Sequence, residues 1–147
     1  MARILAMDVG TKRIGLAMTD DMRIIASPFE VVPNDENFWN YLKKIVPFYR
    51  IDCFVLGKPV HDGENSFLPF VVSFGCRLAQ EFSFPIYWQD ETLSSKETRL
   101  HLIASGKRGK KLKQNIDRYA AQAILANFLE MYGKNRGELF LPDKELL

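Results

Sequence analysis

Residues 4–19 read Ile-Leu-Ala-Met-Asp-Val-Gly-Thr-Lys-Arg-Ile-Gly-Leu-Ala-Met-Thr, and this stretch decides the fold. The apolar run 4–9 is short and ends before Gly10, which favours a buried strand over a helix. In residues 13–19 the larger apolar side chains alternate with glycine and alanine, which predicts a second strand. Because only residues 10–12 link them, we expect the two strands to form a hairpin.

The same patterns predict the rest of the fold. Residues 23–32 form a third extended stretch, and Pro28 within it favours an edge position or a bulge. Three opening strands followed by alternating helices and strands indicate an α/β fold with one mixed, five-stranded sheet: an antiparallel meander, parallel strands, and helices on both faces. Further strands are expected at 53–56 and 86–88, and helices near 34–47 (capped by Asn34 or Asp35), 66–82, 94–104 and 116–132.

The size and composition indicate one globular domain. The chain has 147 residues, of which 47% are hydrophobic and 26% are charged, a balance unlike that of disordered chains. We expect the domain to span residues 1–133 and residues 134–147 to form a tail. With neither a signal peptide nor a membrane span expected, the predicted location is the cytoplasm. Cys53 and Cys76 lack metal-ligand spacing and are expected to be buried, reduced thiols.

Acidic side chains occur at three places where a carboxylate needs a partner. Asp8 lies among apolar neighbours in the first strand, Asp90 and Glu91 directly follow a buried strand, and Asp117 opens the last helix. Each also has a structural interpretation: Asp8 as a turn cap, and the others as acids that stabilise a helix N-terminus. If these segments pack together, their carboxylates can hold Mg²⁺, with Mn²⁺ as an alternative, for phosphodiester cleavage.

Basic residues cluster beside the last of these acids. A lysine-rich loop between the last two helices suits a polyanion and would hold a nucleic-acid backbone without reading its sequence. The alternative is an ordinary solvated loop. The candidate nucleic-acid contacts are Lys12, Arg13, Lys58, Lys107, Arg108, Lys110, Lys111 and Lys113.

Four blocks of the sequence resemble the YqgF (RuvX) family of bacterial RNase H-like proteins. Residues 8–17, Asp-Val-Gly-Thr-Lys-Arg-Ile-Gly-Leu-Ala, are similar to the opening motif of the family. Gly57-Lys58-Pro59 with Asp62-Gly63 is similar to its Gly-Leu-Pro and Asp-Gly segment, residues 90–95 to its Asp-Glu-Arg-Leu-Thr-Thr, and Asp117 with Ala120-Ala121 and Ile124-Leu125 to its closing helix. Together the blocks cover most of the chain, in order and with ordinary spacing.

The resemblance implies an RNase H-like fold and a metal-dependent nuclease. Its implied roles are processing of the 5′ end of the small-subunit ribosomal RNA precursor or resolution of Holliday junctions. Asp8, Glu91, Asp117 and Asp90 are the implied catalytic residues, and we favour Glu91 over Asp90 as a metal ligand beside Asp8 and Asp117. Lys58 replaces the usual leucine of the family and Thr92 the arginine; Lys58 is a candidate to supply the missing cation.

Two other functions fit parts of the pattern. A nucleic-acid-binding or ribosome-assembly module could keep the fold and the basic loop without cleaving. An ATPase of the actin and sugar-kinase kind shares the Asp-x-Gly-Thr turn but needs a second domain, for which this chain is too short. The sequence leaves RNA and DNA open as substrates, and it leaves open whether the protein is a monomer or a homodimer.

Overall fold

The protein forms a twisted six-stranded sheet with helices on both faces. The computed structural model describes residues 2–59, 67–90, 109–132 and 138–139; within the last two ranges, side chains are described only for 119–131. The strand order is β3-β2-β1-β4-β5-β6. The strands are β1 (Arg3–Val9), β2 (Arg13–Thr19), β3 (Ala26–Pro33), β4 (Ile51–Lys58), β5 (Ile86–Asp90) and β6 (Glu138–Leu139), and the helices are α1 (Asn37–Phe48), α2 (Leu68–Glu81) and α4 (Gly109–Tyr132).

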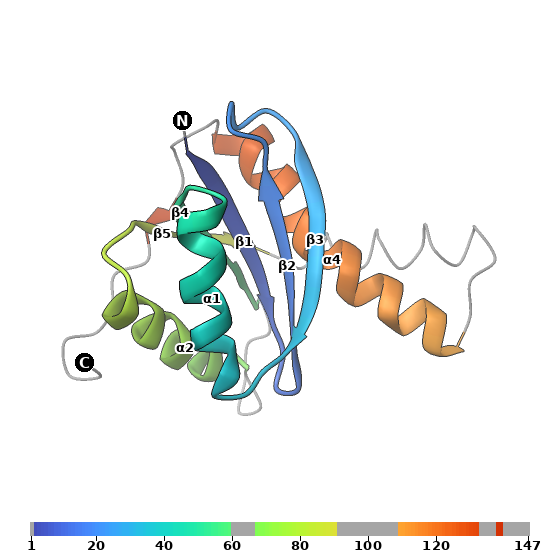
Figure 1. Cartoon of the computed structure of the whole chain (residues 1–147). Coiled ribbons are helices and arrows are strands. Elements are labelled where there is room, and N and C mark those ends of the chain that lie inside the picture. The colour runs from blue at the N-terminus through green and yellow to red at the C-terminus, as the bar shows by residue number, and fades with distance from the viewer. Residues whose placement is uncertain (1, 60–66, 91–108, 133–137, 140–147) are drawn as a thin grey trace.

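The sheet has the predicted mixed topology. β1, β2 and β3 form an antiparallel meander, whereas β4 and β5 join it parallel to β1. Because β1, β4 and β5 are parallel, their carboxyl ends lie at the same end of the sheet, which we call its carboxyl end. The end at which these three strands begin is called the amino end. Figure 1 shows the β1–β2 turn at the carboxyl end.

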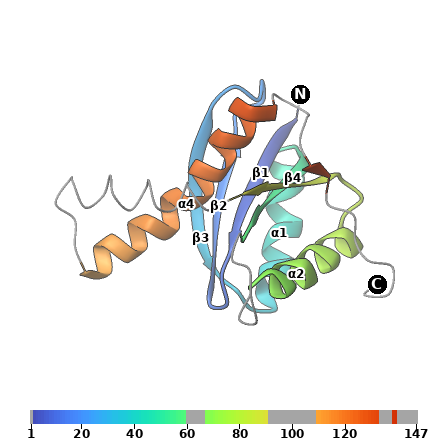
Figure 2. The ribbon, with the colours of Figure 1, turned by 180° about the vertical axis from the view of Figure 1, so that it is seen from behind.

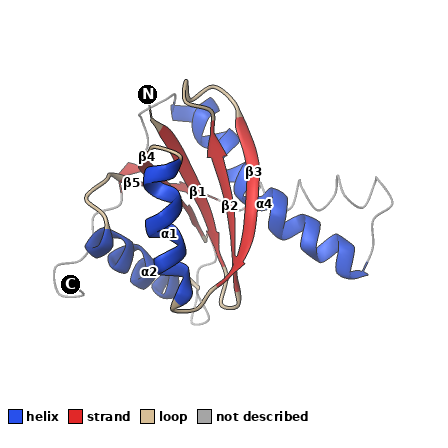
Figure 3. Ribbon diagram, viewed as in Figure 1, coloured by secondary structure: helices blue, strands red, loops and turns tan. Residues whose placement is uncertain are grey.

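The helices cover the two faces separately (Figures 1 and 2). Leu5 and Met7 of β1 face the core shared with α1 and α2, whereas Ile4 and Ala6 face α4. On the α4 face the helix contributes small and aliphatic side chains and one ring: Ala121, Ile124, Leu125 and Phe128. Strand alternation therefore assigns each β1 residue to one of two helical layers, and the layers are plain in Figure 3.

The third strand begins later than predicted. β3 starts at Ala26 because residues 20–25 form a turn, in which the Asp20 carboxylate accepts hydrogen bonds from the Ile24 and Ile25 amides, both at 2.8 Å. The expectation for Pro28 is confirmed: β3 is an edge strand, and its pairing with β2 shifts between Leu16 and Ala17, opposite Glu30 and Pro28.

Helix ends differ from the sequence prediction at two places. The N-cap residue of α1 is Glu36, but the Asp35 carboxylate accepts a hydrogen bond of 3.0 Å from the amide of Asn37, the first helical residue. The Asn34 side chain bonds the β1–β2 turn instead. α4 begins at Gly109, seven residues before the predicted start, so Lys110, Lys111 and Lys113 lie in a helix rather than a loop. Lysine, leucine and glutamine are good helix formers, which explains the extension.

Part of the predicted tail joins the sheet. β6, within residues 134–147, pairs antiparallel with β5 and adds a sixth strand to the five predicted. The expected helix at 94–104 lies outside the described residues. In the described part of the chain, none of the helices combines the length and the apolar character that a membrane span requires.

Candidate active site

Asp8 lies near the end of β1, on the α4 face of the sheet. It follows Ile4 and Ala6 in the alternation, and both of these side chains are fully buried under α4. Asp8 itself is half-buried, at the point where the apolar layer ends. The sequence therefore places one carboxylate where the buried apolar residues of β1 on this face end.

The neighbours of Asp8 across the sheet are glycines. Asp8 pairs with Gly15 of β2. On the other side Met7 pairs with Leu56, so continuing this register by one residue brings Gly57 of β4 beside Asp8. Cross-strand neighbours project from the same face of a sheet. With a glycine on each side, no neighbouring strand places a side chain directly beside the Asp8 carboxylate in that row.

Asp90 projects from the other face. It pairs with Lys58, and its neighbour Trp88 packs in the core with α1 and α2. Asp90 is exposed, at the end of β5. Since adjacent strand residues alternate, Asp90 and Asp8 lie on opposite faces of the sheet.

Gln89 shares the face of Asp8 and is missing from the sequence-based candidates. It pairs with Gly57 and is 5% exposed. Its Nε2 lies 3.8 Å from the Met131 sulfur of α4, and its Oε1 has no hydrogen-bond partner within the described residues. A strand that is predicted to be buried on both faces also buries its polar residues. This was the signal in the sequence that could have revealed a buried Gln89 amide next to Trp88.

Lys58 does not lie on the Asp8 face. Its ammonium group is 5.8 Å from the centre of the Trp88 ring, and its register partner is Asp90. The contact with the ring is a cation–π interaction. This placement weighs against the hypothesis that Lys58 replaces the missing arginine beside the Asp8 carboxylate.

The remaining candidates are described only in part. Asp117 lies in α4 as predicted, but its side chain, like those of Lys110, Lys111 and Lys113, is outside what the structure describes. Glu91, Lys107 and Arg108 lie outside the described residues. Among the side chains that are described, no group of three or more possible metal ligands occurs, so the convergence of the three acids stays a prediction.

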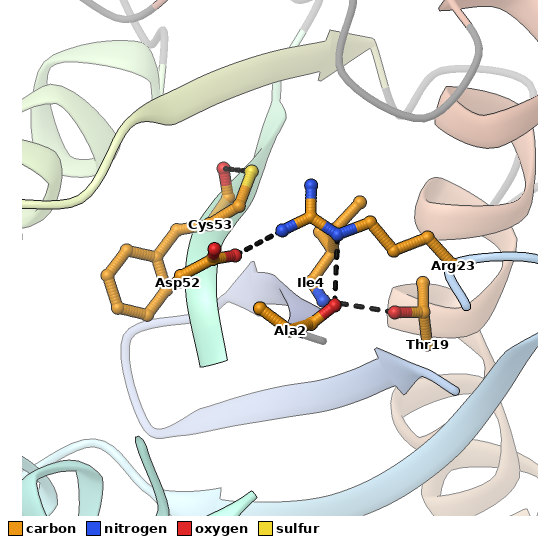
Figure 4. A network of polar contacts seen from close by, with 7 residues as sticks. Ala2, Ile4, Thr19, Arg23, Asp52 and Cys53 are labelled. Carbon is orange, nitrogen blue, oxygen red and sulfur yellow. Dashed lines mark hydrogen bonds and ion pairs between the residues drawn. The ribbon is translucent and has the colours of Figure 1, made fainter. Parts of the chain in front are cut away.

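Polar groups at the amino end of the sheet are bonded to one another (Figure 4). The Thr19 hydroxyl accepts a hydrogen bond of 3.0 Å from the Ile4 amide, and Arg23 donates to the Ala2 carbonyl and pairs with Asp52. Burial raises the pKa of the nearby Cys53 thiol to about 12. Both cysteines are free and buried, as predicted. Burial in apolar surroundings is typical of structural rather than reactive cysteines.

Comparison with known sequences gives a match over most of the chain. Residues 2–131 match the family described as RuvX, Holliday junction resolvase. A Lactobacillus acidophilus protein named "Putative pre-16S rRNA nuclease" is 39% identical over 141 residues, 90% of this chain and 99% of that protein. A protein of the same name from Lactococcus lactis subsp. cremoris is 35% identical over 137 residues, 89% of this chain and 96% of that protein.

Solved structures of resolvases share the fold. Thermus thermophilus RuvC, in complex with a Holliday junction substrate, has a TM-score of 0.56 at 15% identity, covering 95% of this chain and 100% of that one. The fowlpox virus Holliday junction resolvase has a TM-score of 0.51 at 14% identity, covering 87% and 98%. The predicted RNase H-like α/β fold is thus confirmed, and neither the ATPase nor the non-catalytic alternative is favoured. The chain belongs to the RuvX family of nucleases.

Proposed function

We propose that this protein hydrolyses phosphodiester bonds of nucleic acid with the help of Mg²⁺, and that its substrate is the precursor of small-subunit ribosomal RNA. The observation that carries the proposal is the Asp8 carboxylate, half-buried at the carboxyl end of β1 between Gly15 and Gly57. In open α/β sheets this end of the strands is where ligands bind.

Oxygen atoms on the α4 face fit a hard divalent cation. Asp8 offers a carboxylate, and the buried Gln89 Oε1 is an acceptor that no described group satisfies. Mg²⁺ prefers oxygen ligands and keeps several of its waters. When bound, it would activate a water for attack and stabilise the leaving oxygen. Mn²⁺ has similar ligand preferences and is the alternative ion.

Glu91 and Asp117 complete the proposed ligand set. Continued alternation after Asp90 would return Glu91 to the face of Asp8, which supports Glu91 as the ligand and leaves Asp90 a weaker candidate. Asp117 precedes Ala121 by one helical turn, and Ala121 is fully buried against the α4 face of the sheet. Residues four apart share one side of a helix, and this spacing supports Asp117 as a ligand.

The exposed basic residues would bind the phosphate backbone. Lys12 and Arg13 are exposed in and beside the β1–β2 turn, at the same end of the sheet as Asp8. Lys58, Lys107, Arg108, Lys110, Lys111 and Lys113 complete the proposed nucleic-acid surface. Such contacts position a substrate without reading its sequence.

The comparisons bear in two ways on which nucleic acid is the substrate. Relatives that share about 35–39% of their residues with this chain carry the name of a pre-16S rRNA nuclease, which supports RNA and action in the cytoplasm. The family description supports a four-way DNA junction instead. Junction cleavage would call for a homodimer with two facing sites, whereas RNA processing needs only a monomer.

Cleavage assays on both substrates test the proposal. Labelled precursor ribosomal RNA and a four-way DNA junction are incubated with the wild type and with Asp8→Asn, in Mg²⁺, in Mn²⁺ and in chelator. We expect cleavage of the RNA that needs the metal and is lost in Asp8→Asn. Salt-sensitive binding without cleavage of either substrate would instead identify a non-catalytic assembly module.

A further inference from the structure

Asn34 holds the β1–β2 turn from outside the hairpin. Its side-chain Nδ2 donates a hydrogen bond of 2.7 Å to the Gly10 carbonyl, and its backbone amide donates one of 2.9 Å to the Lys12 carbonyl. Asn34 directly follows β3, whose last residue, Pro33, pairs with Arg13. Two carbonyl groups of a turn that is only a few residues long are thus fixed by one residue.

These two bonds also orient amide groups. In a trans peptide the C=O and the N–H point in opposite directions. The Gly10 carbonyl is directed to Asn34, so the N–H of Thr11 in the same peptide is directed away from Asn34. In the described part of the chain, no backbone acceptor is found for that N–H. The turn therefore presents an amide donor on the side away from Asn34.

The turn itself is tight and basic. The Gly10 amide donates to the Arg13 carbonyl at 2.8 Å, and a Cβ on Gly10 would lie 2.8 Å from that oxygen, so this position excludes larger residues. Thr11 and Lys12 are exposed at the tip. An amide donor together with an ammonium group is a suitable contact for a phosphate oxygen.

The turn lies close to Asp8 along the chain. Gly10 is two residues after Asp8, and β1 ends at Val9 between them, so both are at the carboxyl end of the sheet. A displacement of the turn would change where a bound phosphate sits relative to the Asp8 carboxylate. An error of about 1 Å in substrate position can lower a catalytic rate about 100-fold.

We propose that Asn34 is a positioning residue that shapes residues 10–13 into a contact for a backbone phosphate of the nucleic acid, made by the Thr11 amide and the Lys12 ammonium group. The inference rests on the proposed function, because it concerns how the same site holds its substrate. Asn34 acts through the turn and touches no reacting atom.

The test compares Asn34→Ala with a matched control. Gln122→Leu removes the 3.1 Å bond from Gln122 Nε2 to the carbonyl of Ala26, at the opposite end of β3. Both variants thus lose one bond from a side-chain amide to a backbone carbonyl. Binding of labelled precursor ribosomal RNA is measured in the Asp8→Asn background, at several salt concentrations, and KM and kcat are measured without that background.

We expect Asn34→Ala to weaken binding about three- to tenfold and to reduce the slope of log Kd against log salt by about 0.7–0.9, one phosphate contact. KM should rise and kcat should fall, whereas Gln122→Leu should alter neither the slope nor the kinetics. Lys12→Ala should lower the slope by a similar amount. The double variant should lower it no further, because both changes remove the same contact.

Different failures have different meanings. If the wild type shows no salt-sensitive binding, the proposed function itself is wrong. If Lys12→Ala lowers the slope and Asn34→Ala does not, or if the two effects add, the role of Asn34 is refuted while the function stands. An equal loss of binding in Asn34→Ala and Gln122→Leu would show a general loss of stability and would also overturn the inference.

Discussion

The two ends of the sheet differ in whether a buried polar side chain has a hydrogen-bond partner among the described residues. At the amino end, Thr19 satisfies the Ile4 amide, and Arg23 bridges the Ala2 carbonyl and the Asp52 carboxylate. At the carboxyl end, the Gln89 Oε1 is buried without a hydrogen-bond partner among the described residues. The strands are the same, so the difference comes from the side chains at their ends.

This difference suggests that one end of the sheet stabilises the fold and the other end serves the reaction. A buried polar group that has its partner holds strands together, whereas one that lacks a partner destabilises the fold by about 1–3 kcal/mol. Sites that must accept a ligand keep such groups, and the rest of the fold compensates for them. The amino end is therefore expected to control the free energy of unfolding, and the carboxyl end to control cleavage.

Asp8→Asn should produce the largest effect. Losing the carboxylate should slow metal-dependent cleavage by at least about 100-fold, because a neutral amide is a poor ligand for Mg²⁺. Single-turnover rates measure this, and the melting temperature should change little. Asp52→Asn, which alters a carboxylate at the amino end, is the control. Equal slowing in both variants would contradict the division between the two ends.

Gln89→Leu should raise stability and lower activity. Replacing an amide whose oxygen lacks a partner by an apolar side chain of similar size should stabilise the fold by about 1 kcal/mol. Cleavage should fall about tenfold, as for loss of a group that supports a metal site. Denaturant unfolding and Mn²⁺ titration measure the two effects. If metal affinity and cleavage are unchanged in Gln89→Leu, Gln89 has no role at the metal site and only packs against its neighbours.

Thr19→Val should have the reverse pattern. The Ile4 amide would lose its buried acceptor, and the free energy of unfolding should fall by about 1–3 kcal/mol. Cleavage measured well below the melting temperature should be unaffected. Thr19→Ser keeps the hydroxyl and serves as the control. A slowing in Thr19→Val, with normal rates in Thr19→Ser, would show that the amino end also serves the active site.

The Cys53 thiol should give the smallest effect, a dependence of stability on pH. Burial raises its pKa in the folded protein to about 12, above the ordinary value of 9.0 for a thiol. The neutral thiol is favoured by folding, so its contribution is complete below about pH 9 and decreases as the pH rises toward 12, by up to about 1.4 kcal/mol per pH unit. Unfolding of the wild type and Cys53→Ala at pH 8, 9 and 10 measures the difference; parallel curves would contradict it.

Local patterns predicted most of the fold because each strand alternates or is uniformly apolar over several residues. The hairpin at 4–19, the edge position of Pro28 and the two helical faces follow directly from side-chain periodicity. The start of α4 was misplaced because Gly109 and the lysines after it look like a loop, although lysines favour a helix. β6 has two residues, too few for periodicity.

The candidate site was predictable only where it depends on chemical type. Asp8 is conspicuous as an acid in an apolar strand, whereas Gln89 and Asn34 are ordinary residues whose roles depend on register and on contacts across the sequence. Asn34 illustrates the difficulty: a residue suited to capping a helix bonds a turn 24 positions earlier in the chain. Local signals cannot anticipate such a partner.

The edge strand β3 has a consequence for self-association. It borders the sheet on the side away from β6 and carries Pro28 and Pro33, which have no amide hydrogen to donate, and its register shifts near Pro28. Strands of this kind are poor templates for pairing with another chain. Two copies of the protein should therefore not join their sheets through β3. If the protein cleaves the two nucleic-acid strands of a junction as a dimer, contacts between side chains rather than β-strand pairing at β3 would hold the two copies together.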